Sequence, residues 1–415
     1  MLQFSGKEYS TLDKPELSRR TFRCDLWRGA CDGVLSAGIQ TFALFIAIRY
    51  YNAGEWSKSL IASSPFIGMF LSLLFVHYVS GSGLRKAICG AIPAFITAIS
   101  LILAAWAGSS FLFTLFIILG YTCRSSLLPF LTAIYNDNYP ASKRGTYFAI
   151  PLLLTVGIAS IFALLGSSLL EAKLENFTWL FTGLGLMGLV KALAIYKMPS
   201  NAIEGAGHDN PFGNLKYVFQ DKSFGYVLLT WFIMGFANLW ILPLRVDYVT
   251  SATYGIEGSP FLVALLITAI PETTRLIFIP VWARLFDRIN FIVLRMTLNT
   301  LFAIGVALFF ITKDPVIIGL GSGFIGLAFA GGSIAWSLWV TKYAPEGKTA
   351  AYMSVHAFLT GVRGTIGPII GYWTVARIGT VYIGLLSAGM MILATLMLIP
   401  EIRHERGKAV SSPLA

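Results

Sequence analysis

Long apolar runs follow one another along almost the whole chain of 415 residues. A helix of roughly 20 residues crosses a hydrocarbon core about 30 Å thick. Twelve runs have the length of such a helix, and none shows the alternation of a strand. They cover residues 28–50, 59–79, 87–107, 110–134, 146–169, 177–196, 224–244, 260–283, 291–312, 315–340, 350–374 and 378–399. The sequence therefore predicts an all-α polytopic membrane protein with twelve transmembrane helices in the lipid bilayer.

The charge pattern predicts the orientation of these helices. Only 12% of residues are charged, and most of the 31 Lys and Arg residues lie in segments that face the cytoplasm if both termini do. The first twenty residues are polar, so no cleavable signal peptide is expected. The net charge of +11 thus follows from topology and indicates no nucleic-acid partner. Compact loops favour a prokaryotic inner (plasma) membrane with both termini in the cytoplasm.

One long polar interval divides the chain. Residues 197–223 are rich in Gly, Asn and Pro and read as a cytoplasmic linker. The linker separates a six-helix bundle at 28–196 from a second one at 224–399. A cytoplasmic segment, 1–27, precedes the bundles, and a cytoplasmic tail, 400–415, follows them.

A short stretch of the first half is repeated in the second. PASKRGTY at Pro140–Tyr147 returns in outline, 205 positions later, as PEGKTAAY at Pro345–Tyr352. Proline, lysine and tyrosine stand in the same three places. Because the offset is about half the chain, the sequence indicates a duplicated bundle, which is typical of secondary transporters.

The loop after the eighth predicted helix carries a second signal. Its residues ARLFDRIN resemble the signature of the major facilitator superfamily, a Gly-x-x-x-Asp-Arg-x-Gly-Arg run that recurs more loosely between helices eight and nine. Asp287 and Arg288 are kept, while Ala283 and Asn290 take the small and turn positions. The resemblance implies two pseudo-symmetric bundles that rock about a central cavity in an alternating-access cycle.

The equivalent loop of the first half departs from the signature. Arg85 and Lys86 remain, but Ser82 stands where the 205-residue offset places the aspartate. In the signature, the aspartate can accept from a helix N-terminus and pair with a neighbouring arginine, which holds an inner gate shut. The gating residues expected from the resemblance are Asp287, Arg288, Arg144 and Arg85.

Polar residues inside the first bundle are candidates for function, since a charge at a helix centre costs on the order of 3 kcal/mol. Asp32 and Gln40 lie with Ser36 at four-residue steps, so the three share one helix face. Arg124 and Tyr121 lie together on the fourth helix. We expect Asp32 to take part in proton coupling and Gln40, Tyr121 and Arg124 to bind substrate.

The second bundle holds further polar or aromatic candidates within its predicted helices. For substrate binding they are Trp231, Asn238, Arg275 and Arg363, and for proton coupling they are Glu272 and His356.

Several of these residues have an alternative structural role. Asp32 could be a helix-start acid paired with Arg28. Glu272 and Arg275 could neutralise each other at i, i+3. His356 could be a satisfied buried histidine.

Lys191 and Arg124 both lie within predicted transmembrane helices, but only Lys191 has a simple structural explanation. Lys191 lies six residues before Lys197, so we expect it to snorkel to the membrane surface. Arg124 cannot lose its charge at any relevant pH and needs a cavity, an acid or an anionic ligand at its depth.

Three deep arginines against the acids Asp32 and Glu272 leave an excess of positive charge in the core. That excess favours a small anionic substrate, a carboxylate or a phosphate-bearing solute, because guanidinium binds such groups in bidentate fashion. The sequence thus predicts proton-coupled symport of a small organic anion by a monomer, with no cofactor and no metal.

Other functions stay open. The aromatic content of the predicted cavity helices also suits a proton-driven exporter of amphipathic drugs or lipids. A membrane-embedded enzyme would need a cluster of metal-binding acids. The nearest candidate is Asp137, which lies between two asparagines in NDNY and could mimic such a cluster. An ion channel is disfavoured because the duplicated halves suit rocking.

Overall fold

The computed structural model describes residues 13–79, 82–140, 143–203, 212–345 and 348–403. Nearly all of these residues are helical, and the β-type pairing recorded among them is a single bridge between Arg85 and Ala202. The chain divides into two compact units, Met1–Pro211 and Phe212–Ala415, which are here called unit 1 and unit 2.

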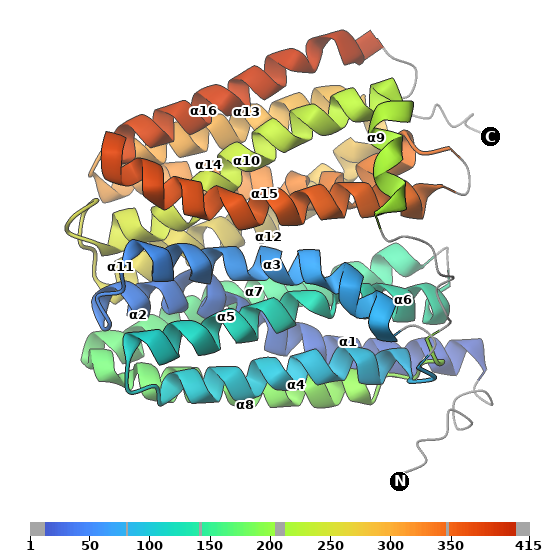
Figure 1. The fold of residues 1–415 in the computed structure, drawn as a ribbon, viewed down its shortest axis with the longest axis horizontal. Coiled ribbons are helices and arrows are strands. Elements are labelled where there is room, and N and C mark those ends of the chain that lie inside the picture. The colour runs from blue at the N-terminus through green and yellow to red at the C-terminus, as the bar shows by residue number, and fades with distance from the viewer. Residues whose placement is uncertain (1–12, 80–81, 141–142, 204–211, 346–347, 404–415) are drawn as a thin grey trace. The chain divides into compact units, whose positions relative to one another are not determined.

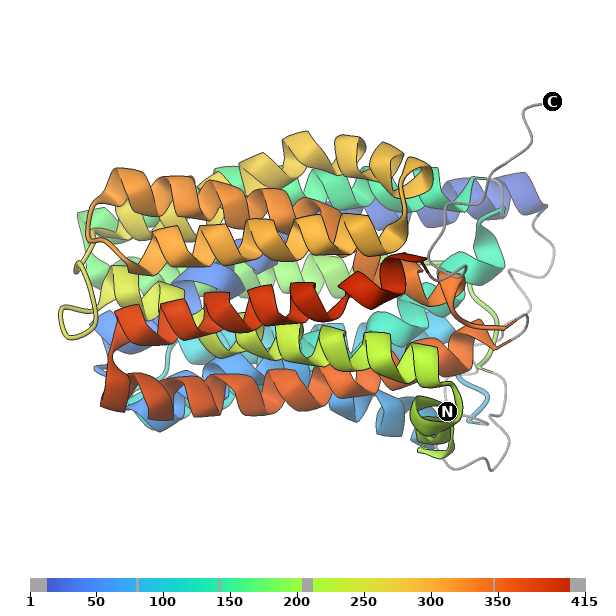
Figure 2. The same ribbon diagram turned by 90° about the horizontal axis from the view of Figure 1, so that it is seen from above.

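Unit 1 is a bundle of long helices that run side by side (Figures 1 and 2). Helix α1 packs along α7 and α8, α4 packs along α5 and α8, and α3 packs along α5. A π-helical segment, Gly38–Phe42, joins α1 to α2, and a 3-10 turn, Leu174–Asn176, precedes α8. The α-helices are α1 (Lys14–Ala37), α2 (Ala43–Arg49), α3 (Glu55–Val79), α4 (Lys86–Ala105), α5 (Ser110–Ser126), α6 (Leu128–Asn138), α7 (Arg144–Ala172) and α8 (Phe177–Tyr196).

Unit 2 repeats this packing scheme in the same chain order. Helix α10 packs along α15 and α16, α13 packs along α14 and α16, and α12 packs along α14. Its α-helices are α9 (Tyr217–Gln220), α10 (Lys222–Thr250), α11 (Pro260–Ala264), α12 (Ile270–Arg288), α13 (Phe291–Phe310), α14 (Pro315–Leu338), α15 (Thr349–Ile378) and α16 (Thr380–Met397). Its other helical segments are the π segment Leu265–Ala269 and the 3-10 turns Gly213–Lys216, Trp339–Lys342 and Ile399–Arg403.

The repeated sequence stretch forms the same turn in both units. Lys143 N donates to Pro140 O at 3.0 Å, and Lys348 N donates to Pro345 O at 3.0 Å. Each lysine then caps a long helix, α7 or α15, with nearly the same backbone angles, φ −120° and ψ −1° against φ −104° and ψ 3°. The resemblance of the two stretches therefore reflects a structural repeat.

The described residues contain eleven helices or joined helices that are long and apolar enough to cross a membrane. Helix α15, with 30 residues, is a further long helix, and it carries the polar residues His356 and Arg363 along its length. The prediction of an all-α polytopic membrane protein with a twelve-helix plan is confirmed.

Helix α1 begins at Lys14, fourteen residues before the first predicted apolar run. Asp13 caps it, because Asp13 Oδ1 accepts from Glu16 N at 3.0 Å, and Pro15 suits the first turn. The polar residues before the predicted span are thus largely helical, whereas residues 1–12 lie outside the described residues.

Two glycines let α1 lie directly against α7. A Cβ at Gly33 would come within 2.7 Å of Thr155 O, and one at Gly29 within 2.8 Å of Pro151 O. Thr155 Oγ1 also donates to Gly29 O at 2.8 Å. This close contact fixes the position of the polar residues on α1, among them Asp32.

Candidate functional site

The centre of unit 1 is a carboxylate surrounded by cations. Asp32, on α1, is 8% exposed. Its Oδ2 accepts from Arg28 Nη1 at 2.6 Å, and its Oδ1 accepts from Lys191 Nζ at 2.7 Å and from Arg124 Nη2 at 3.1 Å. Three cations from α1, α5 and α8 thus share one carboxylate.

A second acid extends this network along α1. Arg28 also binds Asp25 through its Nε. Asp25 is completely buried, and its Oδ1 accepts from Tyr135 Oη on α6 at 2.6 Å. Among these groups, three cations face two carboxylates, so the cluster carries one excess positive charge.

The expectation that Lys191 snorkels to the membrane surface is wrong. Lys191 is 3% exposed, and its ammonium group binds Asp32 inside unit 1. The reason is that Lys191 lies on the side of α8 that packs against α1. Its side chain therefore reaches the Asp32 carboxylate on α1. An apolar run shows how deep a residue lies but does not show which side of the helix faces a partner.

Arg124 is the cation of this cluster with the most exposed side chain, at 23%. Besides Asp32 it binds Ser36 Oγ at 3.0 Å, while its Nε has no hydrogen-bond partner. Tyr121, one turn earlier on α5, donates to Gly38 O at 3.4 Å in the π segment. Gln40 lies in the same segment and is exposed. Asp32 and Ser36 of the predicted stripe thus contact Arg124 on α5.

In unit 2, Glu272 and Arg275 form the pair that their spacing suggests. Arg275 Nη1 donates to Glu272 Oε2 at 3.3 Å, and Arg275 Nη2 donates to Ser333 Oγ on α14 at 3.0 Å. Glu272 is 6% exposed and lies just after the π segment Leu265–Ala269. Such segments are frequent at functional sites.

Further into unit 2, two arginines and a histidine meet at one tryptophan. The Arg295 guanidinium lies 3.6 Å from the centroid of the Trp231 ring, and Arg363 Nη1 donates to Trp231 O. The imidazole of His356 lies 5.0 Å from the same ring, centroid to centroid. Arg295 is absent from the residues predicted for the site, although it falls within the predicted apolar run 291–312 and lies on α13.

The remaining predicted residues lie apart from these clusters. Asn238 is half-buried on α10. Arg85 caps α4, and its Nη2 donates to Tyr196 O at 3.4 Å. Arg288 is exposed at the end of α12. The side chains of Asp287 and Arg144 lie outside the described residues, so the predicted gate stays a prediction.

The NDNY stretch makes structural contacts. Asp137 Oδ2 accepts from Lys86 Nζ at 2.6 Å. Asn138 Nδ2 donates to Thr21 Oγ1 at 2.8 Å and to Pro199 O at 2.7 Å. Asp137 therefore ties α6 to α4, and Asn138 ties it to α1.

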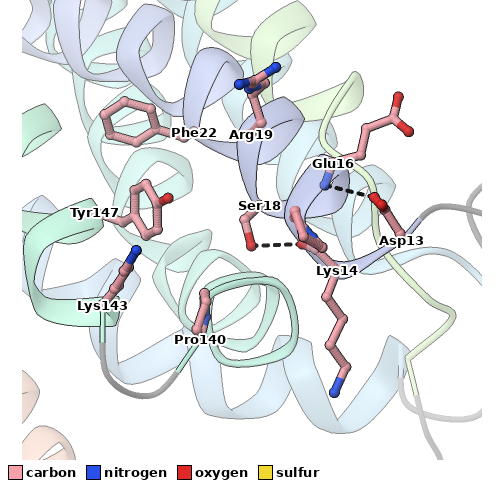
Figure 3. Close-up of a pocket in the computed structure, with 10 residues that line it drawn as sticks. Asp13, Lys14, Glu16, Ser18, Arg19, Phe22, Pro140, Lys143 and Tyr147 are labelled. Atoms are coloured by element: carbon pink, nitrogen blue, oxygen red, sulfur yellow. Dashed lines mark hydrogen bonds between the residues drawn. The ribbon is translucent and has the colours of Figure 1, made fainter.

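A cavity of about 870 Å³ lies where α1 and α7 begin (Figure 3). Phe22 is the wall residue of α1 that lies nearest in sequence to the cation cluster, three residues or about 4.5 Å of helix rise before Asp25. The lining of the cavity does not include the acids and cations of the cluster. Its lining residues are Asp13, Lys14, Pro15, Glu16, Ser18, Arg19, Phe22, Pro140, Lys143 and Tyr147.

Known structures share this fold. A nucleoside transporter, NupG, has a TM-score of 0.71 at 15% identity, over 94% of this chain and 100% of that chain. A D-xylose-proton symporter has a TM-score of 0.72 at 14% identity, over 92% and 98%. The human organic anion transporter MFSD10 (TETRAN) has a TM-score of 0.65 at 16% identity, over 92% and 99%.

Sequence comparison leads to the same family. No curated protein matches the chain. The family model for the Major Facilitator Superfamily, however, matches residues 33–364 and 251–414. These matches cover most of both units and confirm the resemblance inferred from the two loops. The chain belongs to the Major Facilitator Superfamily and is a membrane transporter rather than an enzyme.

Proposed function

We propose that this transporter moves a small organic anion, a carboxylate or a phosphate-bearing solute, by proton-coupled symport with alternating access. One observation carries the proposal: Arg124 shares the Oδ1 atom of Asp32 with Lys191. The carboxylate partner of Arg124 thus also forms ion pairs with Lys191 and Arg28.

An anionic substrate can take the place of Asp32 at Arg124 at little electrostatic cost. When Arg124 turns to the substrate, Asp32 keeps Arg28 at 2.6 Å and Lys191 at 2.7 Å, so no buried carboxylate is left unpaired. The guanidinium offers a planar fork that suits two oxygens of one carboxylate or phosphate. Its Nε, which has no partner, provides one further donor. We assign Tyr121 and Gln40 to the same binding region.

For proton coupling, Glu272 suits the task better than Asp32. Asp32 is occupied by ion pairs with three cations at 2.6–3.1 Å. Glu272 has an ion pair with Arg275 at the longer distance of 3.3 Å, and Arg275 is also bound to Ser333. We assign proton coupling to Glu272 because it lies just after the π segment Leu265–Ala269, and such segments are frequent at functional sites.

The other predicted features belong to the same proposal. We propose that the protein works as a monomer in a prokaryotic inner membrane, with both termini in the cytoplasm. We propose further that Asp287, Arg288, Arg144 and Arg85 close an inner gate. The fold shared with an organic anion transporter and with a proton symporter is compatible with this function.

The proposal is tested in liposomes that enclose a pH-sensitive dye. Organic anions, organic cations and neutral sugars are added in turn, and solute-dependent proton movement is recorded. We expect an anion to give the signal, Arg124→Ala to reduce it by about tenfold or more, and Arg124→Lys to restore part of it. Arg20→Ala removes an exposed arginine on α1 and serves as the matched control.

The opposite result would be equally clear. If only lipophilic cations or neutral amphipaths move protons, and Arg124→Ala leaves that movement unchanged, the substrate is not an anion. The export of amphipathic drugs or lipids would then be the better description.

A further inference from the structure

Unit 2 contains a second cationic cluster that the proposed mechanism at Arg124 does not use. Its members come from α10, α13, α14, α15 and the 3-10 turn after α14. We call it the tryptophan–arginine cluster, and its members are Trp231, Arg295, Trp336, Trp339, His356 and Arg363.

The cluster buries two guanidinium groups without an acid. Arg295 is 3% exposed and Arg363 is 4% exposed. Arg295 contacts the face of the Trp231 ring at 3.6 Å and Met234 Sδ at 2.9 Å. Arg363 donates to Trp231 O and, at 3.0 Å, to Thr360 Oγ1. Within the described part of the chain, neither arginine forms an ion pair, so two buried positive charges lack a counter-charge.

Several donors of the cluster are buried without a hydrogen-bond partner. They include Arg363 Nε and the indole Nε1 atoms of Trp231 and Trp339. Both ring nitrogens of His356 are in the same state, and the exposed fraction of His356 is 0%. A buried polar group without a partner destabilises the folded state, and a charged one does so more strongly. Unpartnered donors beside uncompensated cations point to an acceptor that carries negative charge.

The surroundings favour a small anion over an organic one. Trp231 stacks on Trp339 with ring centroids 5.5 Å apart, and Trp339 stacks on Phe224 at the same distance. At Gly235, an added Cβ would come within 2.4 Å of Arg363 Cζ, so α10 lies tightly against this guanidinium. Close stacking and deep burial leave little space for a molecule with a carbon skeleton.

We propose that the tryptophan–arginine cluster binds a small inorganic anion of the chloride class inside unit 2. The anion provides the missing negative charge for Arg295 and Arg363 and links α13 to α15. On this reading Arg363 and Trp231 hold a resident ion, whereas the organic substrate binds elsewhere. The inference goes beyond the proposed transport function and does not depend on it.

The first test measures the thermal stability of the purified protein in detergent. Chloride is titrated against gluconate at constant ionic strength, and fluoride, bromide and sulfate are compared with it. We expect the melting temperature to rise with chloride or bromide and, above the dissociation constant, to follow the logarithm of the ion concentration, because a ligand that binds only the folded state stabilises it in this way. No rise when chloride replaces gluconate, or a rise that is the same with sulfate, would show that chloride has no specific site and overturn the proposal.

Variants then locate the ion. Arg363→Gln and Arg295→Gln should each raise the dissociation constant for chloride, fitted to this melting-temperature curve, by about tenfold or more. Arg245→Gln is the matched control, since Arg245 is a buried arginine of unit 2 outside the cluster. If the chloride response of Arg363→Gln equals that of the unmodified chain, the assignment is wrong.

A second measurement needs no variant, in case the substitutions prevent folding. Iodide quenches tryptophan fluorescence on contact, and the cluster contains three tryptophans. We expect a saturable part of the quenching in the unmodified protein that chloride abolishes by competition. Purely linear quenching that chloride does not change would also overturn the proposal. Neither assay involves transport, so a negative result here leaves the liposome test of Arg124 unaffected.

Discussion

Lys191 Nζ lies 2.7 Å from Asp32 Oδ1, although the two residues are 159 positions apart in the chain. The pair joins α8 to α1 in the interior of unit 1, and Arg124 of α5 binds the same oxygen. Three helices thus depend on one carboxylate for charge compensation. Replacing Asp32 and replacing Lys191 should therefore affect stability to different degrees.

Replacing the acid should be more harmful than replacing the lysine. Asp32→Asn leaves the buried Lys191 without its carboxylate and takes one away from Arg28 and Arg124, and we expect a loss of about 3–5 kcal/mol. Lys191→Met leaves Asp32 with Arg28 and Arg124 and should cost clearly less. Because the two residues interact, the double variant should be more stable than the sum of the single losses predicts. Thermal denaturation of the four proteins checks this order, and strictly additive losses would contradict it.

The close contact of α1 with α7 gives a second prediction. Gly33→Ala places a Cβ within 2.7 Å of a backbone oxygen, which cannot move aside as a flexible side chain would. We expect a loss of about 1–3 kcal/mol. Gly183→Ala on α8 is the matched control, since nothing lies within 4 Å of its added Cβ. Equal melting temperatures for the two variants would show that α1 can shift without cost.

A third prediction contrasts hydrogen bonds to a charged and to a neutral acceptor. Tyr135 donates to the carboxylate of Asp25 at 2.6 Å, whereas Tyr226 donates to the backbone oxygen of Met397 at 2.7 Å. Tyr135→Phe should cost about 1.5–3 kcal/mol and Tyr226→Phe about 1 kcal/mol. Chemical denaturation of both variants measures the difference, and a larger loss for Tyr226→Phe would contradict the charged character of the Asp25 site.

The sequence sufficed for the architecture because the relevant signals are local. Apolar runs indicate helices, and the paired stretches at Pro140–Tyr147 and Pro345–Tyr352 predict a repeat that the matched turns display. The pairing of Glu272 with Arg275 is likewise a matter of spacing within one helix.

The site was harder to predict, since it depends on which helix faces meet. The depth of Asp32 and Arg124 within their helices indicates a role for both, whereas the depth of Lys191 does not show that it faces Asp32. Arg295 likewise lies within a predicted apolar run, and only the packing of α13 shows that it contacts Trp231. A single sequence gives depth along a helix and says little about rotation around it.

The last prediction concerns the proton. Glu272→Gln keeps the shape of the side chain but cannot take up a proton, so uptake driven by a pH gradient should be lost. Exchange of substrate across the liposome membrane without a gradient should continue, because Arg124 and its neighbours are unchanged. Glu171→Gln alters an exposed acid at the end of α7 and serves as the control. Gradient-driven uptake that survives in Glu272→Gln would assign the proton to another group. Loss of both uptake and exchange would instead mean that Glu272 is needed for substrate binding or for the conformational cycle itself.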